Sequence, residues 1–140
     1  MAKKARDIMS GDCTCIGEND SVLDAAKLLK EKDVGAVPIC GEDDRLKGML
    51  TDRDIAVKVL AKDRDPGSTT AGELGEGKPV TIGADDSVDE ALKTMAEHKV
   101  RRLPVIDGHE LIGIVSQGDL ATQVNEEQVG DLVEAISAAP

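Results

Sequence analysis

The chain has 140 residues, a formal net charge of -11 and no Phe, Tyr or Trp. The negative charge repels phosphate groups, so we expect binding neither to nucleic acid nor to a membrane surface. Without aromatic rings the chain also lacks the usual stacking surface for single-stranded nucleic acid. No apolar run approaches the roughly 18 residues of a membrane span, and the basic segment Met1–Lys4 is not followed by an apolar stretch. We therefore expect a cytoplasmic protein.

Almost the same sequence occurs twice along the chain. Ile16–Val22 recurs as Ile82–Val88, and Gly48–Asp54 recurs as Gly113–Asp119. A unit of about 60 residues buries only a marginal core by itself, which favours two copies packed face to face with a groove between them. The expected organisation is repeat 1 over residues 6–61, a linker over 62–69, repeat 2 over 70–124 and a helical tail over 125–140.

The first repeat should contain three strands and two helices. Asp20 or Ser21 can cap a helix whose apolar residues recur at helical spacing from Val22 to Leu29, and which should end near Asp33. The other predicted elements are strands over Thr14–Ile16, Val34–Cys40 and Leu46–Leu50, a turn over Gly41–Asp44, and a helix over Asp52–Leu60.

The second repeat shows the same order from Val80 to Val124. Before it, Thr70–Glu73 has capping-box spacing and predicts a short helical turn, the counterpart of Arg6–Met9. The tail carries apolar residues at helical intervals between Asn125 and Ala138, which predicts an extra helix. The expected fold class is α/β (α+β), with two strand–helix–strand–strand–helix repeats related by pseudo-twofold symmetry and a C-terminal helix.

The turn at Gly48–Asp54 leads a strand into a helix N-terminus, where free amides and the helix dipole favour an anion. Thr51 can cap the helix or donate its hydroxyl to a phosphate oxygen. Asp54 can accept hydrogen bonds from ribose hydroxyls, and Arg53 can supply positive charge. The alternative is that Thr51 and Asp54 only cap the helix.

The second copy of the turn differs in charge. Ser116 and Asp119 take the equivalent positions, but Gly118 replaces Arg53, so the two sites should be unequal. Arg101 and Arg102 can restore positive charge there, or they can form ordinary surface salt bridges.

These features resemble the tandem CBS domain, named after cystathionine beta-synthase, over residues 6–124. The resemblance rests on the strands around Pro38 and Pro104 and on the two Gly-to-Asp turns. It implies phosphate near the Thr or Ser, ribose on the Asp, and a base between aliphatic side chains, although core packing is the alternative for those aliphatic residues. The expected ligand-binding residues are Thr51, Asp52, Arg53, Asp54, Val37, Ile39, Ser116, Asp119, Arg101, Arg102, Leu103 and Val105. Because proline cannot donate to a sheet ladder, strand pairing should be interrupted at Pro38 and Pro104.

Three cysteines, Cys13, Cys15 and Cys40, allow two interpretations. Cys13 and Cys15 should point to one face of a strand, and Cys40 ends the strand expected beside it, so a Cys15–Cys40 disulfide is geometrically plausible. The alternative is that all three are reduced, as is usual in the cytoplasm. A metal site is less favoured, because neither His98 nor His109 has suitable spacing to the cysteines.

No catalytic constellation is found in the sequence, so we expect a protein that is not an enzyme. The leading hypothesis is a sensor that binds an adenine-containing ligand, such as AMP, ADP, ATP, NAD or S-adenosylmethionine, between the repeats and requires no cofactor. The alternative is a stress-related structural or interaction protein with empty grooves and a redox-responsive Cys15–Cys40 pair. The family resemblance implies a homodimer, and an additional protein partner is possible in either case.

Overall fold

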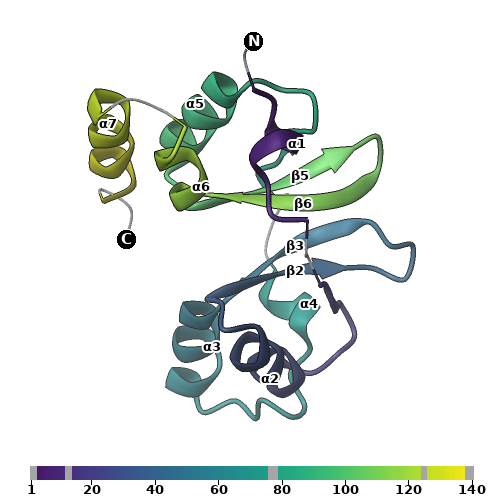
Figure 1. Cartoon of the computed structure of the whole chain (residues 1–140). Helices are drawn as coiled ribbons and strands as arrows, with labels where there is room; N and C mark the ends of the chain where they lie inside the picture. The colour runs from purple at the N-terminus through teal and green to yellow at the C-terminus, as the bar shows by residue number, and fades with distance from the viewer. Residues whose placement is uncertain (1–2, 12–13, 76–78, 124–125, 138–140) are drawn as a thin grey trace. The chain divides into compact units, whose positions relative to one another are not determined.

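In the computed structural model, which describes residues 3–11, 14–75, 79–123 and 126–137, the chain forms two compact units (Figure 1). Residues Thr14–Pro79 make up one unit, named here the contiguous unit. Residues Met1–Cys13 and Val80–Pro140 make up the other, named the split unit because it is assembled from two separate parts of the chain.

The contiguous unit is a three-stranded sheet with helices. Its sheet has the order β1-β2-β3, with β1 parallel to β2 and β2 antiparallel to β3. Its elements are β1 (Ile16–Gly17), α2 (Val22–Lys32), β2 (Ala36–Cys40), β3 (Leu46–Thr51), α3 (Asp52–Lys58), the 3-10 turn η1 (Leu60–Lys62) and α4 (Ala71–Leu74).

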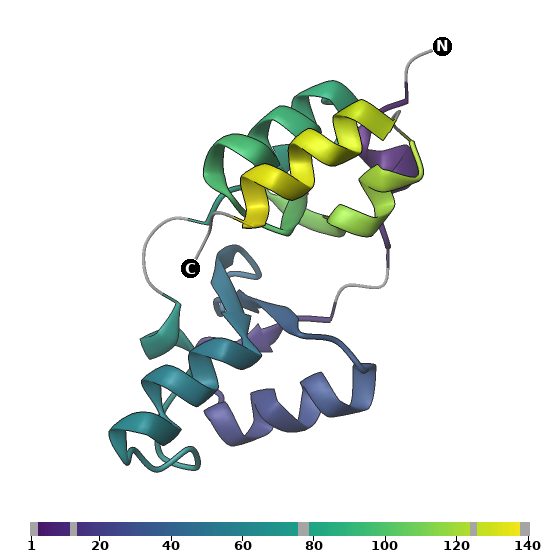
Figure 2. The same ribbon diagram turned by 90° about the vertical axis from the view of Figure 1, so that its left-hand side faces the viewer.

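The split unit repeats this arrangement with the sheet order β4-β5-β6. Its elements are α1 (Ala5–Ile8), β4 (Ile82–Gly83), α5 (Val88–His98), β5 (Arg102–Asp107), β6 (Glu110–Ser116), α6 (Gln117–Ala121) and α7 (Glu126–Ser137). In Figure 2 α7 lies alongside α5, and its Leu132 and Ile136 are buried in the core of this unit. The expected fold class and repeat order are confirmed.

The main helix of each unit begins at a serine cap. Ser21 Oγ accepts a hydrogen bond from the Asp24 amide at 3.0 Å, and Ser87 Oγ accepts one from the Glu90 amide at 3.1 Å. Both helices end at a residue in the left-handed region, Asp33 with φ 54° and Lys99 with φ 55°. Between these ends the apolar side chains at helical spacing are buried, so the sequence pattern located both helices correctly: Val22, Ala25 and Leu29, and Val88, Ala91 and Met95.

Strand pairing continues past the prolines on one side only. Pro38 pairs with Met49 of β3, so the antiparallel ladder passes through it. On the other side β1 pairs with β2 only at Ile39 and Cys40, beyond the proline. The prediction that strand pairing is interrupted at Pro38 is therefore wrong for the pairing of β2 with β3. It is right only for the pairing of β2 with β1, which begins after the proline.

A short segment at the start of each repeat completes the unit that holds the sheet of the other repeat. In the split unit, the amide of Ala5 in α1 donates to Asp86 O at 2.8 Å, and Ser10 exchanges two backbone hydrogen bonds with Ile114 of β6. In the contiguous unit, the amides of Ala71 and Gly72 in α4 donate to Asp20 O and Glu18 O at 2.8 and 2.9 Å. The segment at the start of each repeat therefore packs on the sheet of the other repeat.

The segment expected as a linker, residues 62–69, lies within the contiguous unit. Thr69 is buried, its hydroxyl donates to Asp65 O at 2.8 Å, and its carbonyl accepts from the Val22 amide at 2.8 Å. The compact units consequently do not coincide with the repeats of the sequence. No helix in the described parts of the chain is long and apolar enough to cross a membrane.

Two glycines allow the segments that contain α1 and α4 to approach the sheets closely. A Cβ atom at Gly113 of β6 would lie 2.7 Å from Ser10 O, and it would also overlap the Met9 side chain. A Cβ atom at the equivalent Gly48 of β3 would lie 3.2 Å from the Gly75 Cα. A side chain at Gly113 would therefore push the N-terminal segment off its sheet.

Candidate functional site

The first Gly-to-Asp turn forms a reciprocal helix cap at the start of α3. Thr51 Oγ1 accepts from the Asp54 amide at 3.1 Å, and Asp54 Oδ2 accepts from the Thr51 amide at 3.0 Å. The capping role considered for these side chains is therefore present. The remaining Asp54 oxygen, Oδ1, lies 3.4 Å from Lys58 Nζ.

The other two amides at the start of α3 are also occupied. The Asp52 amide donates to Gly35 O at 2.9 Å, and the Arg53 amide donates to the carboxylate of Asp52 at 2.8 Å. An anion approaching these amides would have to displace that carboxylate, which also repels it. This turn is consequently a poor phosphate site in the observed arrangement.

The second turn has the same cap, but the amides at the start of its helix have different hydrogen-bond partners. Ser116 Oγ accepts from the Asp119 amide at 3.1 Å, and Asp119 Oδ2 accepts from the Ser116 amide at 2.8 Å. The Gln117 amide donates to Arg101 O at 2.9 Å. The Gly118 amide, however, finds no acceptor among the described residues. The two turns are therefore unequal, and the second one keeps a free donor.

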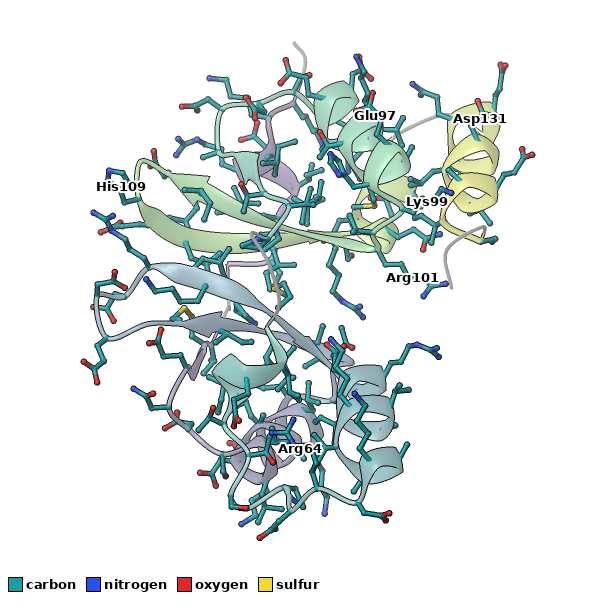
Figure 3. The ribbon with its side chains drawn as sticks, turned by 180° about the vertical axis from the view of Figure 1, so that it is seen from behind. Arg64, Glu97, Lys99, Arg101, His109 and Asp131 are labelled. Atoms are coloured by element: carbon teal, nitrogen blue, oxygen red, sulfur yellow. A yellow bond between two sulfur atoms is a disulfide. The ribbon has the colours of Figure 1, made fainter. Side chains whose placement is uncertain are left out.

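Positive charge also lies beside the second turn. Arg102 pairs with Ser116 in the β5–β6 register, and Arg101 precedes β5 (labelled in Figure 3). Both arginines are exposed, and neither forms an ion pair with another described residue. The salt bridges considered for them are thus not seen within the described residues. In the first turn the exposed side chain of Arg53 is the corresponding cation.

The aliphatic residues expected to flank a base lie in the cores. Val37 and Ile39 belong to the apolar cluster of the contiguous unit, and Leu103 and Val105 belong to that of the split unit. All four side chains are buried. Core packing therefore accounts for them, and contact with a base stays a prediction, as does the groove between the repeats.

Cys15 and Cys40 are joined by a disulfide in the structure, with their Cα atoms 5.7 Å apart. The bridge ties the residue before β1 to the last residue of β2, where Gly17 pairs with Cys40. Cys13 lies outside the described residues. Within the described residues no group of three His, Cys, Asp or Glu side chains is placed to hold a metal ion. His98 lies at the end of α5, and His109 lies at the β5–β6 turn (Figure 3).

One ion pair that the sequence did not suggest links α1 to the turn after β4. Arg6 Nε donates to Asp85 Oδ1 at 3.0 Å, and this hydrogen bond lowers the pKa of Asp85 below its ordinary value. Arg6 belongs to the first repeat and Asp85 to the second. No local motif could have indicated this pair, because it depends on the exchange of segments between the repeats.

Each unit contains one capped strand-to-helix turn, at Thr51–Asp54 and at Ser116–Asp119, so the chain is a tandem repeat of one α/β unit. The family model "CBS domain" matches residues 5–61 and 71–126, so the chain belongs to the CBS domain family.

Relatives and solved structures show the same architecture. The chain is 49% identical over 132 residues to Hypoxic response protein 1 of Mycobacterium tuberculosis, covering 94% of this chain and 92% of that one. The crystal structure of Hypoxic Response Protein I with two coordinated zinc ions matches with a TM-score of 0.81 and 50% identity, covering 88% of this chain and 100% of that one. The CBS domain pair of MJ0100, in complex with 5-methylthioadenosine and S-adenosyl-L-methionine, matches with a TM-score of 0.77 and 28% identity, covering 88% and 96%.

Proposed function

We propose that this protein is a non-enzymatic, homodimeric regulatory module that binds an adenine-containing ligand at its Gly-to-Asp turns. The ligands considered are AMP, ADP, ATP, NAD and S-adenosylmethionine, and no other cofactor is required. The observation that carries the proposal is the duplicated turn, in which Thr51 with Asp54 and Ser116 with Asp119 have the same geometry. The adenosine compounds bound by the MJ0100 pair support this ligand class. Its cytoplasmic location stays a prediction from the sequence.

The second turn is the preferred place for a phosphate group. The free Gly118 amide and the exposed Arg101 and Arg102 side chains favour an anion there, whereas the Asp52 carboxylate disfavours one at the first turn. In this arrangement Ser116 donates its hydroxyl to the phosphate, and the free oxygen of Asp119 accepts from a ribose hydroxyl. Ligands with more phosphate groups should therefore prefer the Ser116 turn.

Calorimetry with the five ligands tests this assignment. The double variant Ser116→Ala/Asp119→Ala should weaken binding of a nucleotide at least tenfold, about 1.4 kcal/mol, and Thr51→Ala/Asp54→Ala should weaken it less. Ser21→Ala/Ser87→Ala is the matched control, since it removes two helix caps away from the turns and should leave affinity unchanged. If none of the five compounds binds more tightly than millimolar, the sensor proposal is lost.

The disulfide favours a second candidate function, a redox-responsive structural protein with empty grooves. The bond closes a loop between Cys15 and Cys40 within the contiguous unit, so its reduction to two thiols by a dithiol would remove a covalent constraint on that unit alone. For a loop of this length the constraint is worth about 3 kcal/mol of unfolding free energy. Mass spectrometry of unreduced protein should find Cys15 and Cys40 blocked, and thermal unfolding with and without reductant should differ for wild type but not for Cys15→Ser/Cys40→Ser. A free Cys15 under oxidising conditions would exclude this candidate.

A further inference from the structure

Lys58, the last residue of α3, contacts the oxygen of Asp54 that the helix cap leaves unused. Lys58 Nζ lies 3.4 Å from Asp54 Oδ1, while Asp54 Oδ2 accepts from the Thr51 amide. Lys58 follows Asp54 by four residues in the same helix, and side chains with this spacing are neighbours. Both oxygens of this carboxylate therefore already have a partner within the chain.

A second acceptor fixes the position of the Lys58 side chain. Lys58 Nζ also donates to Leu74 O at 3.5 Å, the carbonyl at the end of α4. Only 31% of the Lys58 side chain and 21% of the Asp54 side chain are exposed. Water and salt therefore screen this ion pair less than they would screen one on the open surface.

The second turn lacks an equivalent contact among the described residues. The residue that corresponds to Lys58 is Gln123, which lies beyond the end of α6 and donates its side-chain amide to Thr122 Oγ1 at 3.3 Å. Asp119 Oδ2 accepts from the Ser116 amide, as in the first turn, but Asp119 Oδ1 finds no partner in the part of the chain that the structure describes. The two aspartates thus share the capping bond and differ in whether the second oxygen is free.

This difference matters for a ligand that carries a ribose. In the proposed function the second oxygen of the aspartate accepts a hydrogen bond from a ribose hydroxyl. At Asp119 the hydroxyl meets a free acceptor, whereas at Asp54 it has to compete with the ammonium group of Lys58. A hydrogen bond from a charged donor is stronger than one from a neutral hydroxyl, so the exchange at Asp54 is unfavourable.

We propose that Lys58 is a built-in competitor for the ribose at the first turn and thereby directs ligands to the Ser116 turn. The first turn is occupied only by a ligand that displaces the ammonium group from Asp54. That displacement also removes the contact of Lys58 with Leu74 O, so binding at the first turn would alter the contact between α3 and α4. The inference rests on the proposed function and names the residue that makes its two sites unequal.

Adenosine is the suitable probe, because it carries both ribose hydroxyls and no phosphate group that a lysine would attract. Calorimetry uses the full chain with Ser116→Ala/Asp119→Ala as the background, which removes the polar side chains of the second turn. Adding Lys58→Met should raise the affinity for adenosine about tenfold, since the hydroxyl then displaces no charged donor. Lys58→Arg, which keeps a cation at this position, should leave the affinity low.

The matched control is Lys62→Met in the same background. It removes the same charge from an exposed side chain that follows α3 and forms no ion pair with another described residue, so the affinity for adenosine should not change. Circular dichroism should show the same fold for both methionine variants. An equal gain in the Lys62 variant would mean that only the net charge matters, and it would overturn the proposal.

Dideoxyadenosine, which lacks both ribose hydroxyls, identifies the contact. The gain from Lys58→Met should be absent with this compound, and a gain of the same size would show that Lys58 does not act on the ribose. If Lys58 instead serves a phosphate group, Lys58→Met will weaken binding of AMP and leave adenosine unchanged. That result also contradicts the proposal.

The same titrations separate this inference from the sensor function. If the wild type binds one of the five adenine compounds but Lys58→Met does not improve adenosine binding, the sensor function stands and the role of Lys58 is overturned. If Lys58→Met binds adenosine while the wild type binds none of the five compounds, the role of Lys58 is supported and the sensor function is lost. The absence of binding in every variant overturns both.

Discussion

The hydroxyl groups of Thr51 and Ser116 serve the fold before they can serve a ligand. Each hydroxyl oxygen accepts a hydrogen bond from the amide of the aspartate three residues later. The carboxylate of that aspartate accepts one from the amide of the Thr or Ser. The sequence predicts both pairs as ligand-binding residues with capping as the alternative; the capping hydrogen bonds are present, and ligand binding stays a prediction. The sequence could not decide between capping and binding, because the same atoms suit both roles, and the position of Asp52 on the Arg53 amide could not be inferred from spacing.

Removing one capping hydroxyl should destabilise the protein without any ligand present. We expect Thr51→Ala and Ser116→Ala each to lower the free energy of unfolding by about 1 kcal/mol, the usual value of an N-cap side chain. Urea denaturation of the ligand-free protein measures this. Ser137→Ala, at the exposed end of α7, should have no effect and serves as the control. Unchanged stability in Ser116→Ala would show that its hydroxyl does not act as the cap.

The Arg6–Asp85 pair should make the stability of the split unit depend on acid pH. The hydrogen bond from Arg6 lowers the pKa of Asp85 below 3.8 in the folded state. The contribution of the Arg6–Asp85 pair to the free energy of unfolding is therefore present above pH 3.8, and it is lost as the pH falls through the lowered pKa. Asp85→Asn should therefore unfold at a lower temperature than wild type at pH 7 and at the same temperature in strong acid. Thermal unfolding across this pH range checks the prediction, and a difference that persists in strong acid would contradict it.

Among the helices and strands, the sequence predicted best those with a cap and a full apolar period. The helix from Ser21 to Asp33 was located correctly because its serine cap, buried face and terminal residue agree. The placement of α1 and α4 could not be predicted, because each of these short helices packs on strands of the other repeat. The α3 helix shows a further limit: its apolar spacing predicts a helix, but not that Val57 remains exposed while Ile55 packs on the core.

Two glycine substitutions should have opposite effects on the elements that contain them. Gly113→Ala should destabilise the protein by about 1–3 kcal/mol, because its Cβ would lie 2.7 Å from Ser10 O on the segment that crosses β6. Gly130→Ala in α7 should stabilise it by about 0.5–1 kcal/mol, because a Cβ there meets nothing within 4 Å and alanine favours the helix. Chemical denaturation of the two variants beside wild type gives both values. A tolerated Gly113→Ala would mean that Met9 and Ser10 do not lie against β6.

At the scale of the whole molecule, the duplicated sequence predicts two similar α/β repeats, whereas each compact unit combines segments from both repeats. Residues 14–79 form one unit without interruption, whereas the other unit needs residues from both sides of it. Repetition shows which segments are alike, but it does not show which of them pack together. The choice depends on hydrogen bonds between distant segments, such as those between Ser10 and Ile114.

A fragment of residues 14–79 should therefore fold alone, while a fragment cut at the repeat boundary, residues 1–61, should not. The first retains the hydrogen bonds of α4 to Glu18 and Asp20 and the buried Thr69, and the second lacks all of them. Cooperative thermal unfolding followed by circular dichroism distinguishes the two. A cooperative transition for residues 1–61 would contradict the division of the chain into a contiguous and a split unit.

The split unit also has a consequence for synthesis on the ribosome. The segment around Ala5 and Ser10 is translated before residues 14–79, but its partner Ile114 is translated only after they have been completed. At about 5–20 residues per second, the nascent N-terminus waits roughly 2–7 s with its amides unpaired after the middle of the chain can fold. This segment therefore reaches its native position only after β6 has been translated, and during that interval it is accessible to proteases and chaperones.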